Sequence, residues 1–292
     1  MSEGTLELIK NYMRDRKLCH KLNMLAKKTF GIEFEQWVEN GYYDGRYIPY
    51  SFYKDGIIIS NVSVNLMEFT LFGQKKNYIQ IGTVMTEEGY RKQGYAKQLI
   101  EYVLEDYMEK VEGIYLFGTD YAKDFYVKLG FQQGNQYRYF RKLEKKEAPC
   151  MFEKVDKDSL LHQKVYLQYI REMTENSALD MKNYGLMTYW TWDMEHIYYS
   201  KTLDCYVALE KKEDTLYLNA IISPRKVSTM EVIRQMGGGF SKVLLGFTPK
   251  EEELGEFEVE LYKEKDTNFL YLGDEFRYIE EKKLFFPLYS HA

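Results

Sequence analysis

Hydrophobic and polar positions along the first half of the chain follow two different periods. After residue 96, apolar residues recur three and four positions apart, which is typical of a helix with one buried face. Apolar runs over 57–66 and 78–86 predict strands, and Lys54-Asp55-Gly56 predicts the hairpin turn before the first of them. The full set that we expect is strand 6–10, helices 14–29 and 33–40, strands 51–54, 57–66 and 78–86, helix 94–109, strand 114–118, helix 121–129 and hairpin 131–143.

The second half of the chain repeats the order of strands, helix and strand. The elements that we expect there are strand 151–155, helix 160–173, hairpin strands 204–210 and 216–223, helix 227–236, and strands 242–247, 257–262, 269–272 and 284–288. Charged, proline-ended Glu144–Pro149 is the best linker candidate. We therefore predict an α/β protein with mixed sheets and two domains, residues 1–145 and 150–292.

Length, charge and cysteine content narrow the class of protein. A chain of 292 residues is long for one compact domain, and 45% apolar residues are enough for real cores. A net charge of −5 without a long basic run argues against nucleic acid as the main partner, and no apolar run approaches a membrane span. Three scattered cysteines fit reduced, buried thiols in a cytoplasmic protein, and the histidines show no metal-ligand spacing.

The segment Arg91-Lys92-Gln93-Gly94-Tyr95-Ala96 joins the predicted strand 78–86 to the amphipathic helix. Backbone N–H groups at a helix start have no internal partners, and the helix dipole favours negative charge there. Gly94 allows close approach of the backbone to a phosphate. The dinucleotide and P-loop glycine patterns both fail here, so the loop indicates a different phosphate-bearing ligand.

The pattern R-x-x-G-x-A after a strand resembles the pyrophosphate loop of the GNAT superfamily, the acyl-CoA-dependent N-acetyltransferases. A second stretch, Ala122 to Phe131, is similar to the later GNAT helix pattern A-x-x-F-Y-x-K-x-G-F, in the right order and at the right distance. The resemblance covers about residues 1–145, and its specific motifs lie in 78–131. It implies a GNAT fold there, followed by a degenerate GNAT-like domain, because the turn Ser223–Ser228 lacks the loop pattern.

The resemblance also implies roles for individual residues. The backbone N–H groups of the loop would bind the pyrophosphate of acetyl-CoA, with Arg91 and Lys92 adding charge at the surface. Carried over by position, Asp120 falls where many relatives have an asparagine that binds the pantetheine arm, and this departure puts that contact in doubt. Tyr126 would protonate the departing thiolate, which a phenol can do. The strand before the loop would splay from its neighbour, so that its free backbone groups bind the pantetheine arm and the thioester oxygen. The residues with a cofactor role are thus Thr83, Val84, Met85, Arg91, Lys92, Gln93, Gly94, Tyr95, Ala96 and Asp120.

Neither the general base nor the acceptor pocket follows from the sequence alone. Glu68 and Glu87 are candidate bases, although each fits a solvated charge better, and a water chain could accept the proton instead. An aromatic wall could bind a cationic amine through cation–π contacts or could simply cover the core. Tyr189-Trp190-Thr191-Trp192 could close the pocket or seal the domain interface. The residues proposed for the wall are Trp37, Tyr42, Tyr43, Tyr47 and Tyr50.

These observations lead to one hypothesis and two competitors. We expect an N-acetyltransferase that moves an acetyl group from acetyl-CoA to a primary amine of a small molecule or peptide, without nucleic acid or membrane partners; a homodimer is compatible with the chain. The first competitor is a non-catalytic acyl-CoA-binding module, and the second is a nucleotide- or phosphate-sugar-binding protein. Gly237-Gly238-Gly239 fits a phosphate nest less well than a flexible connection.

Overall fold

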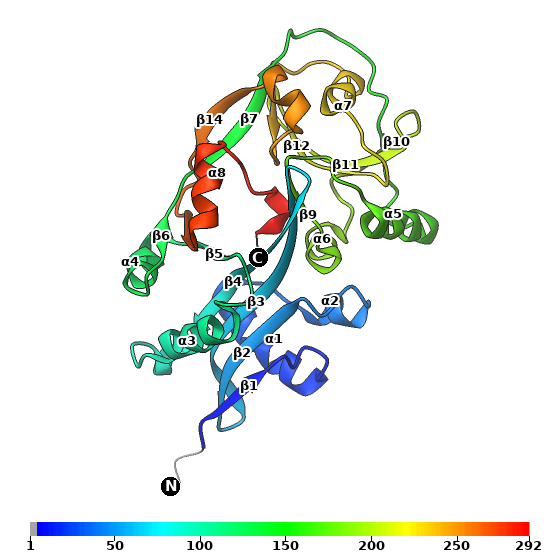
Figure 1. The fold of residues 1–292 in the computed structure, drawn as a ribbon. Helices are drawn as coiled ribbons and strands as arrows, with labels where there is room; N and C mark the ends of the chain where they lie inside the picture. Colours follow the sequence, from blue (N-terminus) through cyan, green and yellow to red (C-terminus); the bar gives the residue numbers. More distant parts are fainter. Residues whose placement is uncertain (1–4, 292) are drawn as a thin grey trace.

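The computed structural model describes residues 5–291, which form two mixed sheets with helices on their faces (Figure 1). The predicted mixed α/β class is confirmed. In the first sheet β4 and β5 pair in parallel, and the other neighbouring strands pair antiparallel. The order of this sheet is β1 (Glu7–Lys10), β2 (Tyr47–Lys54), β3 (Ile57–Leu71), β4 (Gln74–Thr86), β5 (Gly113–Gly118), β15 (Asn268–Leu272) and β6 (Gln132–Gln133), with β9 (Leu179–Met181) paired to β3.

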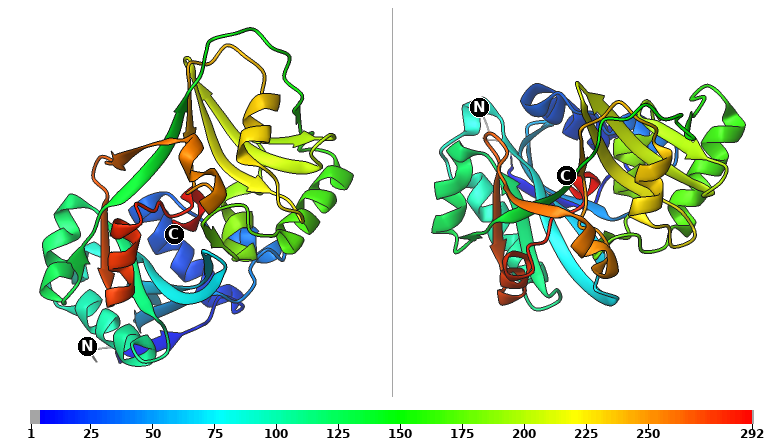
Figure 2. Two further views of the ribbon diagram at one scale, coloured as in Figure 1. Left: turned by 45° about the horizontal axis from the view of Figure 1, so that its top comes forward. Right: turned by 90° about the horizontal axis from the view of Figure 1, so that it is seen from above.

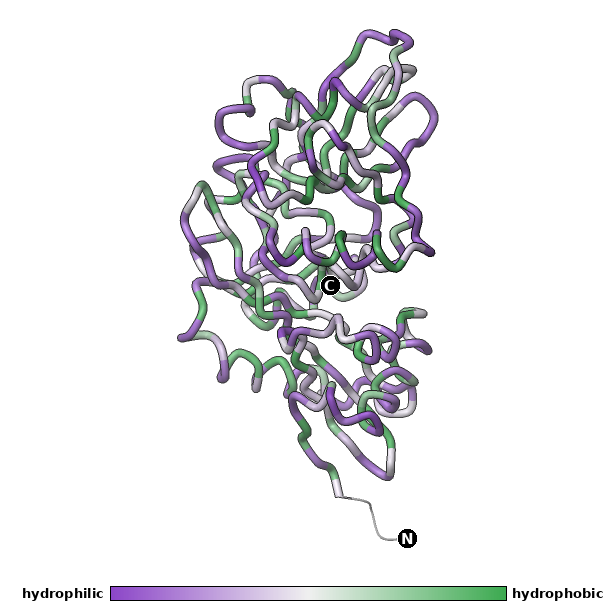
Figure 3. The backbone as a smooth tube through the Cα atoms, turned by 90° about the vertical axis from the view of Figure 1, so that its right-hand side faces the viewer, coloured by the Kyte–Doolittle hydropathy of each residue, from purple (hydrophilic) through white to green (hydrophobic). Residues whose placement is uncertain are grey.

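Helices cover both faces of the first sheet. On one face lie α1 (Arg16–Phe30) and α2 (Glu35–Glu39), and on the other lie α3 (Tyr95–Tyr107) and α4 (Asp120–Lys128). The apolar stripe predicted for α3 is buried, with Leu99, Ile100 and Val103 packed against the strands. Hydrophilic and hydrophobic residues alternate in short runs along the helices, as amphipathic surface helices require (Figure 3). No helix within residues 5–291 is long and apolar enough to span a membrane.

The second sheet repeats the central unit of the first. Its parallel strands β12 and β13 are joined through α7, as β4 and β5 are joined through α3. The strand order is β14 (Glu258–Tyr262), β7 (Gln136–Lys142), β13 (Lys242–Leu245), β12 (Thr215–Ile222), β11 (Cys205–Lys212), β10 (Ile197–Ser200) and β8 (Glu153–Lys154). The remaining helices are α5 (Leu160–Glu172), α6 (Tyr184–Thr191), α7 (Thr229–Gln235) and α8 (Arg277–Glu281), and short 3-10 helices are η1 (Glu88–Tyr90), η2 (Glu251–Glu256), η3 (Asp274–Phe276) and η4 (Leu288–Ser290).

The two sheets exchange a strand, which the local pattern did not predict. Strand β7, from the N-terminal half, lies between β13 and β14, whereas β15, from the C-terminal half, lies between β5 and β6 (Figure 2). The predicted hairpin over 131–143 is therefore wrong, because β6 and β7 belong to different sheets. A division at residue 145 likewise does not separate the sheets.

One apolar core spans the two sheets. It includes Phe69 and Tyr115 of the first sheet, Tyr206 of the second, and Tyr166 of α5. Phe286 stacks on Tyr115, with ring centroids 4.6 Å apart. Because burial of such surface is the main favourable term in folding, this shared core holds the two halves as one unit.

Two further expectations are wrong. Residues 284–288 form no strand: the N–H of Phe285 donates to the Thr248 hydroxyl, and the N–H of Phe286 donates to the Gln136 side chain. Side-chain oxygens, and not the backbone of a neighbouring strand, thus accept these backbone hydrogen bonds. Cys150 is exposed in the linker, whereas Cys19 and Cys205 are buried as expected.

Candidate active site

Strands β4 and β5 separate at the centre of the first sheet. Their parallel register runs from the pair Tyr78–Gly113 to the pair Gln80–Tyr115, and no pairing between them follows within the described residues. Strand β4 continues to Thr86 and β5 to Gly118. Backbone groups that would pair in a continuous sheet therefore face an opening between the strands.

A β-bulge shapes the β4 side of this opening. Opposite Ser63 lies Gly82, but opposite Asn61 lies Met85, so β4 carries an extra residue at Thr83–Val84. Thr83 has φ of +44°, a conformation that β-branched residues rarely adopt. The amide of Asn61 donates to the Thr83 carbonyl oxygen at 2.9 Å, which holds the bulge in place.

A buried hydrogen-bond chain extends from the bulge into the sheet. The Tyr47 hydroxyl lies 2.7 Å from the Thr83 hydroxyl and accepts a hydrogen bond from Ser63. Asn61 in turn donates to Ser63 and accepts from Ser51. Fully satisfied buried networks of this kind fix a single arrangement, so Thr83 and Tyr47 form a rigid side of the opening.

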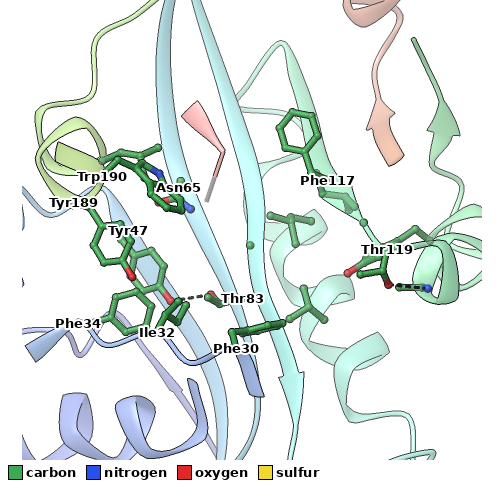
Figure 4. A pocket seen from close by; sticks show the side chains of 18 of the residues that line it. Phe30, Ile32, Phe34, Tyr47, Asn65, Thr83, Phe117, Thr119, Tyr189 and Trp190 are labelled. Carbon is green, nitrogen blue, oxygen red and sulfur yellow. Dashed lines mark hydrogen bonds between the residues drawn. The ribbon is translucent and has the colours of Figure 1, made fainter. Parts of the chain in front are cut away.

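A cavity of about 340 Å³ occupies the opening and extends past β4 to α1, α2 and α6. Figure 4 shows side chains from both halves of the chain around it, with Tyr189 and Trp190 of α6 facing Phe30, Phe34 and Tyr47. The residues that line it are Phe30, Ile32, Phe34, Trp37, Tyr47, Asn65, Ile81, Gly82, Thr83, Val84, Leu116, Phe117, Gly118, Thr119, Ala122, Tyr126, Leu186, Tyr189 and Trp190.

The predicted phosphate loop has the geometry of an anion site. Gly94 is the N-cap of α3 with φ of +86°, and no side chain caps this helix start. The first helical bond is accepted by the Gly94 carbonyl from Gln98. Arg91 donates through Nε to the Thr86 carbonyl, and Lys92 is exposed. The loop therefore offers uncapped backbone donors beside two exposed cations, Arg91 and Lys92, which fits a pyrophosphate.

Tyr126 reaches the cavity from α4 on the β5 side. Its side chain is 5% exposed, and Gly118 of β5 lies against its ring. Burial raises the pKa of Tyr126 far above that of a free phenol, so the hydroxyl stays protonated at neutral pH. A neutral phenol at this position can donate to a developing thiolate.

The other predicted cofactor residues divide into two groups. Thr83 and Val84 line the cavity, together with Ile81 and Gly82, whereas Met85 is buried under α1. Asp120 does not line it: its carboxylate accepts from Asn268 of β15 at 2.8 Å. The inserted strand thus contacts one oxygen of the Asp120 carboxylate.

The aromatic wall is only partly the one expected. Trp37 and Tyr47 line the cavity, whereas Tyr42, Tyr43 and Tyr50 do not. Sequence reasoning missed Phe30, Ile32, Phe34 and Asn65, since their spacing equally fits ordinary core positions. Trp37 Nε1 donates to the Gly185 carbonyl at 2.9 Å, which joins α2 to α6.

Neither candidate base lines the cavity. Glu87 pairs with Lys28, and this hydrogen bond holds the pKa of Glu87 below its usual range. Glu68 lies 3.9 Å from Arg46. Both carboxylates are therefore structural or solvated charges, and the described cavity lining contains no Asp, Glu or His.

The corresponding helix start in the second sheet is filled by the protein itself. Ser228 caps α7, and the Glu253 carboxylate accepts from the Ser228 hydroxyl at 2.7 Å and from the Thr229 N–H at 3.2 Å. The Gly238 and Gly239 N–H groups donate to linker carbonyls. These contacts leave no open anion site at either position.

Comparison with known proteins agrees with this geometry. Residues 15–134 match the family model described as an acetyltransferase (GNAT) domain. No curated protein matches the chain. Among solved structures, a conserved protein of unknown function from Enterococcus faecalis V583, a probable N-acyltransferase, is 17% identical with a TM-score of 0.59, covering 94% of this chain and 74% of its own.

Two further structures have the same fold. A GCN5-related N-acetyltransferase from Kribbella flavida is 15% identical with a TM-score of 0.55, over 92% of this chain and 71% of its own. Eis1 from Mycobacterium abscessus is 11% identical with a TM-score of 0.54, and the match covers 91% of this chain and 72% of Eis1. The likeness extends over both sheets. The loop, the separated strands and the family match together identify residues 15–134 as a GNAT acetyltransferase domain.

Proposed function

We propose that the protein transfers an acetyl group from acetyl-CoA to a primary amine of a small molecule or peptide, by direct attack in a ternary complex. The observation that carries this proposal is the convergence of three features on one side of the first sheet. These are the uncapped start of α3, the separated strands β4 and β5, and the Tyr126 phenol in the cavity between them.

Each feature has a chemical task in this proposal. The N–H groups of Gln93, Gly94, Tyr95 and Ala96 bind the pyrophosphate, and backbone groups of Thr83 and Val84 that face the opening bind the pantetheine arm and polarise the thioester oxygen. Tyr126 gives its proton to the departing sulfur. Amine and thioester meet where the bulge of β4 faces the aromatic wall.

Direct attack is supported by the side chains around the cavity. Its lining within residues 5–291 includes no cysteine or serine. The Thr83 hydroxyl is bonded to Tyr47, and the Thr119 hydroxyl caps the Ala122 N–H. Cys19 lies on the buried face of α1, where burial raises its pKa to about 11. No activated nucleophile is therefore available for a covalent acyl-enzyme.

The acetyl group is favoured because one cavity must hold both partners. Its volume of about 340 Å³ contains the thioester end of the cofactor and the acceptor together. Each methylene added to the acyl chain takes space from the acceptor. We therefore expect acetyl-CoA to give a higher kcat/KM than longer acyl-CoA esters.

The test measures thiol release from acetyl-CoA with a panel of amines. Tyr126→Phe should lower kcat by roughly 100-fold or more, the usual contribution of a general acid, with the acetyl-CoA Kd unchanged. Tyr121→Phe is the matched control, because Tyr121 lies on the same helix and is 93% exposed. Tight acetyl-CoA binding without thiol release for any amine would point instead to a non-catalytic acyl-CoA-binding module.

Cofactor binding is tested at the loop. A side chain at Gly94 is strained at φ of +86°, by about 1–2 kcal/mol, so Gly94→Ala should raise the acetyl-CoA Kd roughly tenfold. Gly89→Ala is the control, since Gly89 lies in η1 just before the loop and has no positive φ. Equal Kd values for both variants in calorimetry would contradict the assignment of the loop.

A further inference from the structure

The cavity is unusual for an amine site because its described lining carries no charged side chain. An ordinary alkyl amine arrives as an ammonium ion, with a pKa near the value of about 10.4 for lysine. An ammonium group has three donors and no acceptor, so it requires carboxylates or several oxygen acceptors. The lining supplies no carboxylate for this purpose.

The titratable groups around the cavity do not replace such a carboxylate. Tyr47, Tyr126 and Tyr189 line it, and burial raises the pKa of each, so all three remain neutral. His291 does not line the cavity but stacks on Phe117, and burial lowers its pKa to about 4, which leaves it a weak base. Glu33 lies near Tyr189 but does not line the cavity.

Asn65 adds a neutral amide to the lining and no charge that would balance a cation. Asn65 is 2% exposed, and its Nδ2 atom is buried without a hydrogen-bond partner in the described structure. In Figure 4 the Asn65 side chain lies on the same side of β4 as Tyr189 and Trp190. An unpaired buried donor is costly, so Nδ2 calls for an acceptor atom on whatever occupies this part of the cavity.

The aromatic rings do not change this balance. A cation–π contact is worth up to about 2 kcal/mol, whereas an unpaired buried charge costs considerably more. The rings also cover one another: Trp37 lies edge-on to Tyr47 and Tyr189, with centroids 6.2 and 5.6 Å away. At the mouth, Phe30 and Trp190 are 50% and 44% exposed, which favours an apolar occupant.

We propose that the acceptor is an apolar, weakly basic amine, of the aromatic amine class, which enters the cavity uncharged. This inference rests on the proposed acetyl transfer. The nitrogen lone pair forms the new bond to the thioester carbon, and the carbon–sulfur bond breaks. The nitrogen loses one proton and the sulfur gains one through Tyr126, so a neutral amine needs no external base. An ammonium would first have to release an additional proton, for which the lining holds no acceptor carboxylate.

The test compares two isomers, 4-ethylaniline and phenethylamine, which have the same atoms but differ in basicity. Thiol release from acetyl-CoA is followed from pH 6 to 9. We expect kcat/KM to be at least tenfold higher for 4-ethylaniline at pH 7 and flat with pH. For phenethylamine it should rise about tenfold per pH unit, following the neutral fraction of the amine.

Two results would overturn the inference. One is a preference for phenethylamine or a polyamine at pH 7, with thiol release intact, which leaves the proposed acetyl transfer standing. The other is thiol release with no amine at all, which removes the proposed function and the inference together. The two failures are thus distinguished by the same assay.

A variant pair tests the role of the uncharged wall directly. Trp190→Glu adds a carboxylate at the mouth of the cavity, where Trp190 is already 44% exposed. We expect the ratio of kcat/KM for phenethylamine over 4-ethylaniline to rise at least tenfold at pH 7. Trp192→Glu is the matched control, because Trp192 is 45% exposed and does not line the cavity. An equal ratio in both variants and the wild type would contradict the reasoning.

Discussion

Trp37 connects the N-terminal domain to the helix that completes the cavity, and its replacement tests whether this connection matters for function. Its indole N–H donates to the Gly185 carbonyl of α6 at 2.9 Å, and its ring packs against Tyr189. Trp37→Phe removes this hydrogen bond and part of a ring that is 7% exposed. The change therefore loosens α6, which carries Tyr189 and Trp190.

The expected cost follows from the contacts that are lost. The Gly185 carbonyl still accepts from the Thr188 hydroxyl at 2.9 Å, so it keeps a hydrogen-bond partner in the variant. The lost bond therefore costs about 1 kcal/mol. About three buried ring atoms, at roughly 0.8 kcal/mol per methylene-sized group, add about 2 kcal/mol. We expect Tm to fall by roughly 5–10 °C and the acceptor KM to rise roughly five- to tenfold.

The assay combines calorimetry with thiol-release kinetics, and Trp192→Phe is the control. Trp192 lies at the end of α6, but it is 45% exposed and outside the cavity. The acetyl-CoA Kd should be unchanged in both variants, because α6 is remote from the loop at Gly94. If Trp37→Phe weakened acetyl-CoA binding as much as acceptor binding, or behaved like Trp192→Phe, Trp37 would not hold α6 in place for acceptor binding.

Three further predictions concern the scaffold. Burial opposes ionisation of Glu253, but hydrogen bonds from Ser228 and Thr229 and the charge of Lys250 outweigh it and lower its pKa. This stabilisation is present above the unfolded pKa of about 4.3 and is lost as pH falls through the folded pKa, so in acid denaturation Glu253→Gln should flatten the decline below about pH 5. A methyl group at Gly246 would lie 2.7 Å from the Asn219 Cα, so Gly246→Ala should cost about 1–3 kcal/mol in urea unfolding, unlike Gly255→Ala, whose site is open. Asn61→Ala removes the donor that holds the Thr83 carbonyl, so kcat should fall more than the acetyl-CoA Kd rises; equal changes would count against a positioning role for the bulge.

The loop and the helix of the first domain were predictable because their signals are local. A glycine at positive φ before α3 and apolar residues at helical spacing after it depend on neighbouring residues alone. The motif at Tyr126 was likewise read correctly as a helix, and the structure places its phenol at the cavity. Whether this phenol is the acid remains a prediction.

The predictions that failed concern strands that pair with residues distant in the sequence. The exchange of β7 and β15 pairs residues such as Gln133 with Leu270, and no local pattern distinguishes this pairing from a simple hairpin. The same exchange places Asn268 beside Asp120, where its amide donates to the carboxylate. Period-two patterns define strands but not their neighbours.

By itself, the sequence determined the family of the first domain, its phosphate loop and a single such loop in the chain. The tertiary structure decided what the acceptor meets: aromatic and aliphatic side chains from α1, α2, β3 and α6, with an unpaired Asn65 donor among them. The physical reason is that backbone conformation is encoded by adjacent residues, whereas the polarity of a cavity is the sum of side chains that only folding brings together.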